Sequence, residues 1–466
     1  MKSPELLSPA GTFRNMQFAY AYGADAVYAG QPRYSLRVRN NDFKLDRLAE
    51  GIDYAHQRGK LFFVASNIAP HNAKVRTYLQ DMAPVIEMQP DALIMSDPGL
   101  IMMVRERWPD QVIHLSVQAN VVNYAAVRFW QQLGIQRIIL SRELSLEEIA
   151  EIRAECPDIE LETFVHGALC IAYSGRCLLS GYFNHRDPNQ GTCTNACRWK
   201  YNTHAAQTDA TGDLIPLAPA TGEWSPEQAY DSVSAAGSST AESSKTAGGE
   251  AGQSPLFALL EEANRPGELM PVYEDEHGTY IMNSKDLRAV QHVERLTQMG
   301  IDSLKIEGRT KSHYYVARTA QVYRQAIDDA VAGRPFNRDL MQVLDNLANR
   351  GYTEGFYRRH VHDAHQNYAT GNSLGLNQQF VGEVLPEADE HWLTLEVKNK
   401  FELGDTLELM TPQGNRRFRL EALENARNHQ AMTVAPGTGY RVKIPRPALP
   451  ANADLNFALL MRDLAD

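Results

Sequence analysis

The sequence predicts an α/β fold: a TIM-like (β/α)8 barrel with a cysteine-bearing insertion between strands seven and eight, followed by a small C-terminal all-β domain. Short β-branched and aliphatic runs alternate with longer amphipathic stretches from the first residues onward, which is the pattern of βα units in a parallel sheet. There are eight such runs, the number of strands that closes this type of barrel. Beyond Gln378 the runs become short and alternating, with Gly, Pro and Asn turns, which is typical of a β-barrel or sandwich.

The eight predicted strands can be placed on the chain one by one. Several share a lead-in, a Gly or Pro turn followed by an apolar run, as in GADAVYAG, QPDALIMSD, GIQRIILSRE and GIDSLKIEGR. This lead-in is a weak internal repeat of the βα unit. The predicted strands are Glu5–Ser8, Ala26–Ala29, Leu61–Ser66, Ala92–Ser96, Val112–Ser116, Arg137–Leu140, Ile159–Phe164 and Ser303–Glu307.

The chain makes a long excursion between the seventh and eighth strands. It contains a cysteine-rich loop, for which we predict a cluster-binding role over 166–200, and then a polar insertion over 204–268. The centre of this insertion, Ser232 to Ser254, has almost no large apolar residues, so we expect a flexible, solvated and partly disordered segment.

These patterns give the predicted domain boundaries. The barrel domain spans 1–335 and ends with a closing helix in SHYYVARTAQVYRQAIDDAVAG. A helical connector follows over 336–377, and the C-terminal β-barrel-like domain spans 378–466. A chain of 466 residues exceeds the size at which one hydrophobic core keeps growing, which agrees with two folded units.

Composition restricts the classes of partner. With 43% hydrophobic and 22% charged residues the chain resembles an ordinary soluble protein, and its net charge of -11 confines any RNA contact to local basic patches. The N-terminal sequence lacks the apolar core of a signal peptide, and no window approaches a membrane span. We therefore predict a cytoplasmic protein with no membrane partner.

Four of the five cysteines lie close together, at Cys170, Cys177, Cys193 and Cys197, separated by six, fifteen and three residues. Four thiolates are the ligand set of a structural zinc site or of an iron–sulfur cluster. The tight two-residue knuckles of zinc sites are absent, which favours a cluster over zinc, and both over free buried thiols. Cys156 lies apart in an amphipathic segment and is predicted to be a packed thiol.

Polar residues follow the ends of most predicted strands, where the βα loops of a barrel converge on one mouth. For any one of them a helix cap or a rim hydrogen bond is the simpler interpretation, but together they predict a site at this mouth. They are Asn67, Asp97, Gln118, Asn120, Arg142, Glu143, His166, Glu307 and Arg309.

Longer motifs carry a family resemblance. The segment ETFVHGALCIAYSGRCLLS, with SREL at Ser141–Leu144, HLSVQAN at His114–Asn120 and KIEGR at Lys305–Arg309, resembles the collagenase-like peptidase family U-32. The resemblance covers essentially the whole chain apart from the polar tract between about His204 and Gln253. Within the family the chain is similar to members that modify tRNA, through SPAGTFRNMQFAYAYGADAVYAGQPRYSLRVRNN, GALCIAYSGRCLLSGYFNHRDPNQGTCTNACRW and DEHGTYIMNSKDLRAVQHVERLTQMGIDSLKIEGRTKS.

This resemblance implies a function and a cofactor. The implied reaction is hydroxylation at carbon 5 of the wobble uridine of tRNA, giving 5-hydroxyuridine, with prephenate and not dioxygen as the hydroxyl donor. The implied cofactor is a 4Fe-4S cluster, and the four family cysteines correspond to Cys170, Cys177, Cys193 and Cys197, all present. The implied partners are tRNA through its anticodon loop, prephenate, and the iron–sulfur assembly machinery.

Roles for individual residues follow from this reaction. Prephenate is a dicarboxylate, and carboxylates are best held by the bidentate guanidinium of Arg. We predict Arg142, Arg176 and Arg309 as carboxylate ligands, with Arg33, Arg37 and Arg39 as the next candidates. Further substrate contacts are predicted for Asn67, Gln118 and Asn120, and catalytic roles for His166, Glu307 and Glu143.

Two other function classes remain open. A peptidase would need a nucleophile and a base, and His166 lies close in sequence to Cys170, although four clustered cysteines exceed that need and no HExxH motif occurs. A non-catalytic RNA-binding iron–sulfur protein is the second alternative. RNA phosphate contacts are predicted in the C-terminal domain at Lys398–Lys400, Arg416–Arg419 and Arg441–Arg446.

Overall fold

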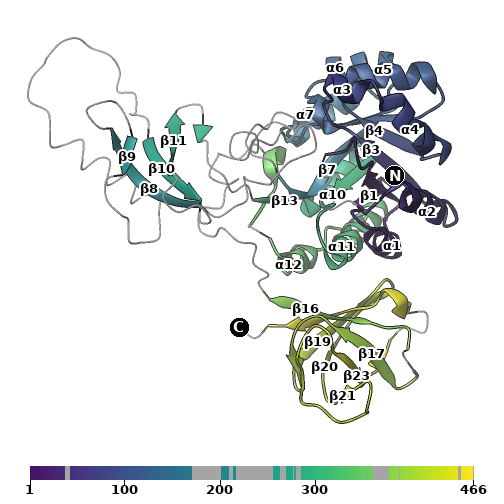
Figure 1. Cartoon of the computed structure of the whole chain (residues 1–466), viewed down its shortest axis with the longest axis vertical. Helices are drawn as coiled ribbons and strands as arrows, with labels where there is room; N and C mark the ends of the chain where they lie inside the picture. The colour runs from purple at the N-terminus through teal and green to yellow at the C-terminus, as the bar shows by residue number, and fades with distance from the viewer. Residues whose placement is uncertain are drawn as a thin grey trace, which may run out of the picture.

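The computed structural model describes 1–36, 42–169, 285–349, 351–358, 377–387, 389–449 and 453–464, together with the backbone of five strands between 201 and 279. Two folded bodies account for most of these residues, and Figure 1 shows them as an α/β body and an all-β body.

The first body is a closed parallel barrel, as the sequence predicts. Each strand pairs in parallel with the next along the chain, and the last strand pairs with both the first and the seventh, which closes the cylinder. All eight predicted runs form barrel strands. The strands are β1 (Glu5–Pro9), β2 (Ala26–Gly30), β3 (Leu61–Ser66), β4 (Ala92–Met95), β5 (Ile113–Leu115), β6 (Arg137–Ile139), β7 (Glu160–Ala168) and β14 (Ser303–Ile306).

A layer of helices surrounds the barrel. Several begin with a side chain that accepts a hydrogen bond from an otherwise unpaired amide of the first turn, as Asp97 does from Leu100 at 2.9 Å. Asp97 is thus a helix cap. The helices are α1 (Phe13–Ala21), α2 (Leu45–His56), α3 (Asn72–Val75), α4 (Tyr78–Glu87), α5 (Pro98–Arg107), η2 (Val117–Ala119), α6 (Tyr124–Gln132), α7 (Leu146–Glu155), η5 (Val290–His292), α10 (Val293–Gln298) and α11 (His313–Val331).

The seventh strand extends beyond its predicted end. Its last residues pair antiparallel with β13 (Asp286–Arg288), which in turn pairs with β15 (Tyr352–Thr353). The chain between β7 and β13 contains a separate antiparallel sheet. Its strands are β8 (Tyr201–Thr208), β9 (Leu214–Pro216), β10 (Leu256–Glu262), β11 (Leu269–Asp275) and β12 (Gly278–Thr279).

This sheet overlaps the predicted polar insertion at 204–268. Strand β8 covers its start, and β9 and β10 fall within it, where segments with apolar residues such as LFALLEE pair with neighbouring strands. Partial disorder of the insertion stays a prediction. The polar centre at Ser232 to Ser254 lies outside the described residues.

The second body is antiparallel, as predicted, and its first strand begins at Gln378. The connector before it contains α12 (Asp339–Asp345) and η6 (Gly355–Arg358). The main sheet has the order β20-β19-β24-β16-β17-β23-β21, so β24, the last strand in the sequence, pairs with β19 and β16 in its interior. The elements are β16 (Gln378–Val384), β17 (Trp392–Val397), β18 (Phe401–Glu402), β19 (Thr406–Thr411), β20 (Gly414–Arg419), β21 (Glu424–Asn425), β22 (Val434–Ala435), β23 (Arg441–Pro445), η8 (Leu455–Phe457) and β24 (Leu459–Asp463).

The two bodies share a buried interface. Helices α1 and α11 face the C-terminal domain (Figure 1), and Met410, Leu459 and Met461 of that domain belong to the core cluster of the barrel. The fully buried Arg318 of α11 donates to both carboxylate oxygens of Glu408, at 3.2 and 3.1 Å. The domain is therefore fixed to the barrel by apolar packing together with a bidentate ion pair.

Candidate active site at the barrel mouth

The carboxyl ends of the barrel strands bring several of the predicted residues together. Arg142, after β6, donates through Nη2 to Glu307 Oε2, after β14, at 3.1 Å. The Arg142 guanidinium also lies over the ring of Phe164, with Cζ 3.8 Å from the ring centroid. Arg309 lies over the ring of Tyr28 at 5.8 Å, so two arginines and one carboxylate predicted from the sequence meet at one mouth.

Lys305 is a member of this group that the sequence analysis did not single out. It lies on β14 between Ser303 and Glu307, and its Nζ is 4.4 Å from the Tyr28 ring centroid and 5.5 Å from that of Phe164. The available signal was a lysine inside an otherwise apolar strand. We call Tyr28, Arg142, Phe164, Lys305, Glu307 and Arg309 the mouth cluster.

A second group at the mouth consists of amides and hydroxyls. Asn67 Nδ2 donates to Ser116 Oγ at 3.3 Å and to Gln118 Oε1 at 3.2 Å. Asn120 ends η2 with a left-handed backbone (φ 52°), which asparagine tolerates, and donates to the Gln118 carbonyl at 3.3 Å. The predicted substrate contacts Asn67, Gln118 and Asn120 therefore lie side by side.

The backbone of Leu36 joins the two groups. Its carbonyl accepts from Arg309 Nη2, and its amide donates to Asn67 Oδ1 at 3.2 Å. Arg309 also passes close to Gly30 at the end of β2, where an added Cβ would collide with the guanidinium and with Ser35 Oγ. Glycine at position 30 thus allows the Arg309 side chain to lie across the mouth.

The other predicted residues lie elsewhere. Glu143 accepts from Ser141 Oγ at 2.5 Å and is half-buried. Arg33 pairs with Asp81 at 2.7 Å, and its side chain is half exposed. Arg37, Arg39 and Arg176 lie outside the described residues, and for them the predicted ligand role stays a prediction.

His166 does not face the mouth. A register shift between Lys305 and Ile306, where β14 pairs with β7, aligns His166 with Ile306, whereas an unbroken register would place His166 opposite Glu307. The His166 ring packs against Tyr315 and Tyr323 of α11, and burial lowers its pKa to about 3. A catalytic role for His166 stays a prediction, and its placement favours a packing role.

A column of buried charges lies beneath the mouth cluster. At the amino ends of the strands, Arg137 pairs with Glu5 at 2.6 Å and with Glu160 at 2.8 Å, and it also reaches Glu162 at 3.3 Å. Glu162 in turn accepts from Lys305 Nζ at 2.9 Å. Burial alone would raise the pKa of Glu162, but the charges of Lys305 and Arg137 bring it below its ordinary value, so Glu162 is a carboxylate at neutral pH.

Family models and relatives cover both bodies. The model of peptidase family U32 matches residues 11–367, and the model of the U32 C-terminal domain matches residues 376–462. The chain belongs to peptidase family U32. It is 61% identical over 465 residues to "tRNA hydroxylation protein P" of Escherichia coli (strain K12), covering 100% of this chain and 98% of that protein.

Two further relatives of this U32 protein have related names. It is 58% identical to "tRNA hydroxylation protein P" of Haemophilus influenzae (strain ATCC 51907 / DSM 11121 / KW20 / Rd), over 99% of this chain and 97% of that protein. It is 33% identical to "tRNA hydroxylation protein P1" of Bacillus subtilis (strain 168), over 88% and 84% of the two chains.

The cysteines of this U32 protein divide into two groups. Cys170, Cys177, Cys193 and Cys197 lie outside the described residues, in the part of the sequence that follows β7. Cys156 is buried at the end of α7, with Sγ 3.6 Å from the Tyr124 carbonyl oxygen, and burial raises its thiol pKa. The prediction that Cys156 is a packed thiol is confirmed. Within the described ranges, no group of three or more His, Cys, Asp or Glu side chains is arranged to hold a metal ion.

The predicted basic segments differ in how their charges are paired. Arg416, Arg417 and Arg419 are exposed on β20, at the edge of the main sheet, and Arg417 lies 3.7 Å from Asp463. Lys398 and Lys400 pair with Glu396 and Glu402 at 3.0 and 3.3 Å. In the third segment, Arg441 and Lys443 lie 4.0 and 3.9 Å from Glu387 and Asp389. In the described part of the chain no ion pair involves Arg416 or Arg419, so β20 has two unpaired arginines on an exposed edge.

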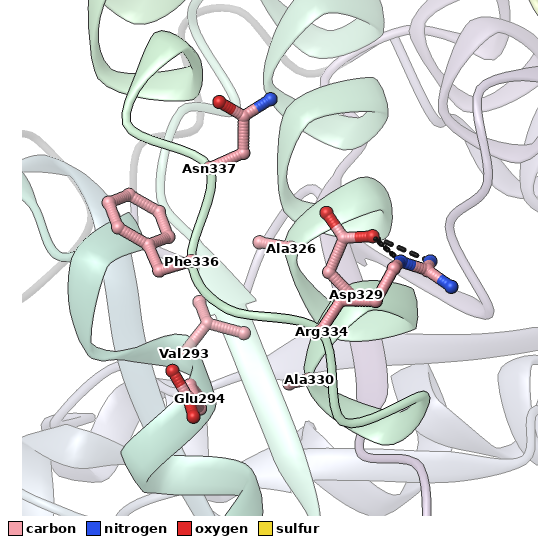
Figure 2. A pocket seen from close by; sticks show the side chains of 8 residues that line it. All are labelled: Val293, Glu294, Ala326, Asp329, Ala330, Arg334, Phe336 and Asn337. Carbon is pink, nitrogen blue, oxygen red and sulfur yellow. Dashed lines mark hydrogen bonds and ion pairs between the residues drawn. The ribbon is translucent and has the colours of Figure 1, made fainter.

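A crevice on the helical layer is not part of the mouth. Figure 2 shows it between α10, with Val293 and Glu294, and α11, with Asp329 paired to Arg334 at 2.6 Å. The crevice lies between helices outside the barrel strands. Because chemistry in this fold occurs at the carboxyl ends of those strands, the mouth and not the crevice is the candidate active site. In the described residues no helix is long and apolar enough to cross a membrane.

Proposed function

We propose that this protein is a tRNA hydroxylase that forms 5-hydroxyuridine at the wobble position. One observation carries the proposal: the identity of 61% to the Escherichia coli "tRNA hydroxylation protein P" extends over 98% of that protein and therefore over both domains. The charged barrel mouth supports it, because chemistry in this fold occurs at the carboxyl ends of the strands. A cytoplasmic location is part of the same proposal.

The proposed hydroxyl donor is prephenate, with no requirement for dioxygen. Arg142 and Arg309 supply guanidinium groups at the mouth, and such groups match a carboxylate in a bidentate way. Glu307 holds Arg142 in place, and Phe164 supports the flat face of its guanidinium. A small dicarboxylate is therefore the ligand class that the mouth fits.

The proposed cofactor is a 4Fe-4S cluster on Cys170, Cys177, Cys193 and Cys197. The donor set fits, because four thiolates are the usual ligands of such a cluster, and the four cysteines follow barrel strand β7 in the sequence. When bound, the cluster would supply electron exchange or a Lewis acid. The iron–sulfur assembly machinery would then be a partner of the chain.

The uracil base has to leave its stack to enter a barrel mouth, which is least costly in a single-stranded anticodon loop. Asn67 and Gln118 carry amide donors and acceptors of the kind that pair with the edge of uracil. The exposed arginines of β20 are proposed to contact tRNA phosphates, which supply affinity more than base specificity.

The peptidase alternative receives less support. A histidine with a pKa of about 3 is a weak base, and His166 packs against α11, so a His166–Cys170 pair is disfavoured. The pentapeptide GNSLG at Gly371–Gly375 has the G-x-S-x-G spacing, but strand β16 follows it, whereas a nucleophile elbow leads into a helix.

The experiment is an anaerobic reaction of purified protein with tRNA lacking the modification, analysed by mass spectrometry of the nucleosides. We expect 5-hydroxyuridine with prephenate and none without it, and no gain from dioxygen. Product that needs dioxygen and not prephenate would refute the donor assignment. Absence of product in every arm, with intact iron and sulfide content, would favour the RNA-binding alternative.

The cofactor is tested by iron and sulfide analysis of the anaerobically purified protein. Replacement of Cys170, Cys177, Cys193 or Cys197 by Ser should each sharply lower the iron content, because a four-thiolate site tolerates loss of a ligand poorly. Cys156→Ser is the matched control and should leave iron unchanged. Stoichiometric zinc without iron or sulfide would contradict the cluster.

A further inference from the structure

Lys305 lies at the base of the mouth cluster and points into the barrel. Its register neighbours on β1 and β7 are Leu7 and Phe164. It shares the inner face of β14 with Ser303, which donates to Glu5 near the amino end, and with Glu307 at the mouth. Lys305 thus occupies the layer between the buried charge column and the mouth.

The ammonium of Lys305 has fewer acceptors than donors. It has three N–H groups, and among the described residues it has one hydrogen-bond acceptor, Glu162, at 2.9 Å. The faces of Tyr28 and Phe164 cover it on other sides. Burial lowers the pKa of Lys305, although Glu162 and Glu307 act in the opposite direction. Aromatic faces stabilise a cation without accepting its hydrogen bonds, so N–H groups of the Lys305 ammonium remain available to a ligand.

The same two rings support three cations. Tyr28 faces Lys305 and Arg309, and Phe164 faces Lys305 and Arg142. Among the described residues two acids pair with these three cations, Glu307 with Arg142 and Glu162 with Lys305. An anionic ligand that enters above the rings therefore meets more positive than negative charge, in a site where burial strengthens each interaction.

We propose that Lys305 is a further binding residue for the donor, contacting an anionic group of the small dicarboxylate that Arg142 and Arg309 hold. The inference rests on the proposed function and deepens it. The two arginines provide planar forks from the rim, whereas Lys305 provides a point charge from below, so the three cations are directed at more than one anionic group of a single ligand.

A purely structural role for the Lys305–Glu162 pair is the competing explanation. A buried pair replaced as a whole by uncharged groups is often neutral for stability, whereas removal of one partner is destabilising. The two explanations therefore predict different behaviour for a variant that removes both charges. Arg137 would keep Glu5 and Glu160 as partners in that variant.

The test compares Lys305→Met with the double variant Lys305→Met/Glu162→Gln in the full chain, purified anaerobically with its cluster. Thermal unfolding and prephenate binding by titration calorimetry are measured for each. We expect Lys305→Met to lower Tm and to weaken prephenate binding by about tenfold to a hundredfold. The double variant should recover most of the Tm but not the affinity. Lys60→Met, which removes a partly exposed lysine 3.7 Å from Asp25, is the control and should bind prephenate normally.

The outcomes separate the two levels of the proposal. Recovery of both Tm and affinity in the double variant would show that Lys305 is structural and would overturn this inference alone. If neither variant folds, Lys305→Arg keeps a charge beside Glu162, and we expect it to bind prephenate at least about tenfold more weakly, because a planar fork does not replace a compact ammonium between two rings. Unchanged affinity there would also overturn the inference. Wild-type protein that does not bind prephenate would overturn the donor assignment, and this inference with it.

Discussion

Two buried cation sites in this molecule use the same residue types for different ends. At the domain interface, Arg318 donates to both oxygens of Glu408, which also accepts from Gln378 and Asn415 at 2.7 Å each. At the barrel mouth, the contacts of Arg142 with other described residues are one hydrogen bond to a carboxylate and the face of an aromatic ring. A carboxylate surrounded by donors holds two elements together, whereas a cation with donors to spare is suited to bind a ligand.

The largest effect should come from removing a mouth cation. Arg142→Ala is expected to weaken prephenate binding by about a hundredfold or more. A buried carboxylate of the ligand that loses its guanidinium partner is left unpaired, which costs about 3 to 5 kcal/mol of binding free energy. The KM for prephenate should rise accordingly, and Arg142→Lys should not restore it, since an ammonium lacks the planar fork. Equal catalytic efficiency in the wild-type protein and Arg142→Ala would show that the mouth cations do not hold the donor.

The interface should respond in stability. Glu408→Gln leaves the fully buried Arg318 without its carboxylate, which should cost about 3 to 5 kcal/mol of unfolding free energy. Denaturant unfolding measures this loss, and prephenate affinity of the folded fraction should be unchanged. Glu402→Gln is a matched control, because the Glu402 side chain is about half exposed and its pair with Lys400 contributes little. Weaker prephenate binding by Glu408→Gln would contradict the assignment of the interface pair to stability alone.

A third, exposed group of cations extends the comparison to the surface. Reversing the charge of Arg416, Arg417 and Arg419 together should weaken tRNA binding while leaving Tm and prephenate affinity near wild-type values. Each lost phosphate contact should flatten the log–log salt dependence of tRNA affinity by about one unit. Unchanged tRNA affinity in the triple variant would move the RNA-binding surface to the barrel.

The smallest expected effect is a pH dependence of the interface. Burial would raise the pKa of Glu408, but Arg318 and the hydrogen bonds from Gln378 and Asn415 bring it below the ordinary value. Because the pKa is lower in the folded state, the pair stabilises the protein above the ordinary carboxyl pKa and loses that contribution as pH falls through the lowered value. Unfolding free energies of wild type and Glu408→Gln should therefore converge as pH falls. Parallel curves down to acid pH would contradict this assignment.

The barrel could be predicted because its determinants are local. Each strand has its own apolar run and its own turn, so the position of β3 at Leu61–Ser66 follows from a few adjacent residues. Arg142 and Glu307 could be predicted as site residues for a related reason, since residues at strand ends share one mouth.

Other features depend on contacts between distant residues. The register shift that turns His166 outward arises where β7 pairs with β14, and nothing adjacent to His166 encodes it. The role of Lys305 could not be predicted from the residues around it, because its partner Glu162 lies on another strand. The Arg318–Glu408 pair likewise joins residues of different domains, and no local pattern marks either one as a partner of the other.

The interior position of β24 has a consequence for synthesis on the ribosome. The sheet of the C-terminal domain has a gap between β19 and β16 until Leu459–Asp463 has emerged, and the barrel core lacks Leu459 and Met461 until the same moment. The nascent chain therefore exposes an apolar face until this strand is available, and both domains reach their final packing only with it. Loss of this one strand in a prematurely terminated chain would expose strand edges in one domain and core surface in the other, which marks such products for aggregation or degradation.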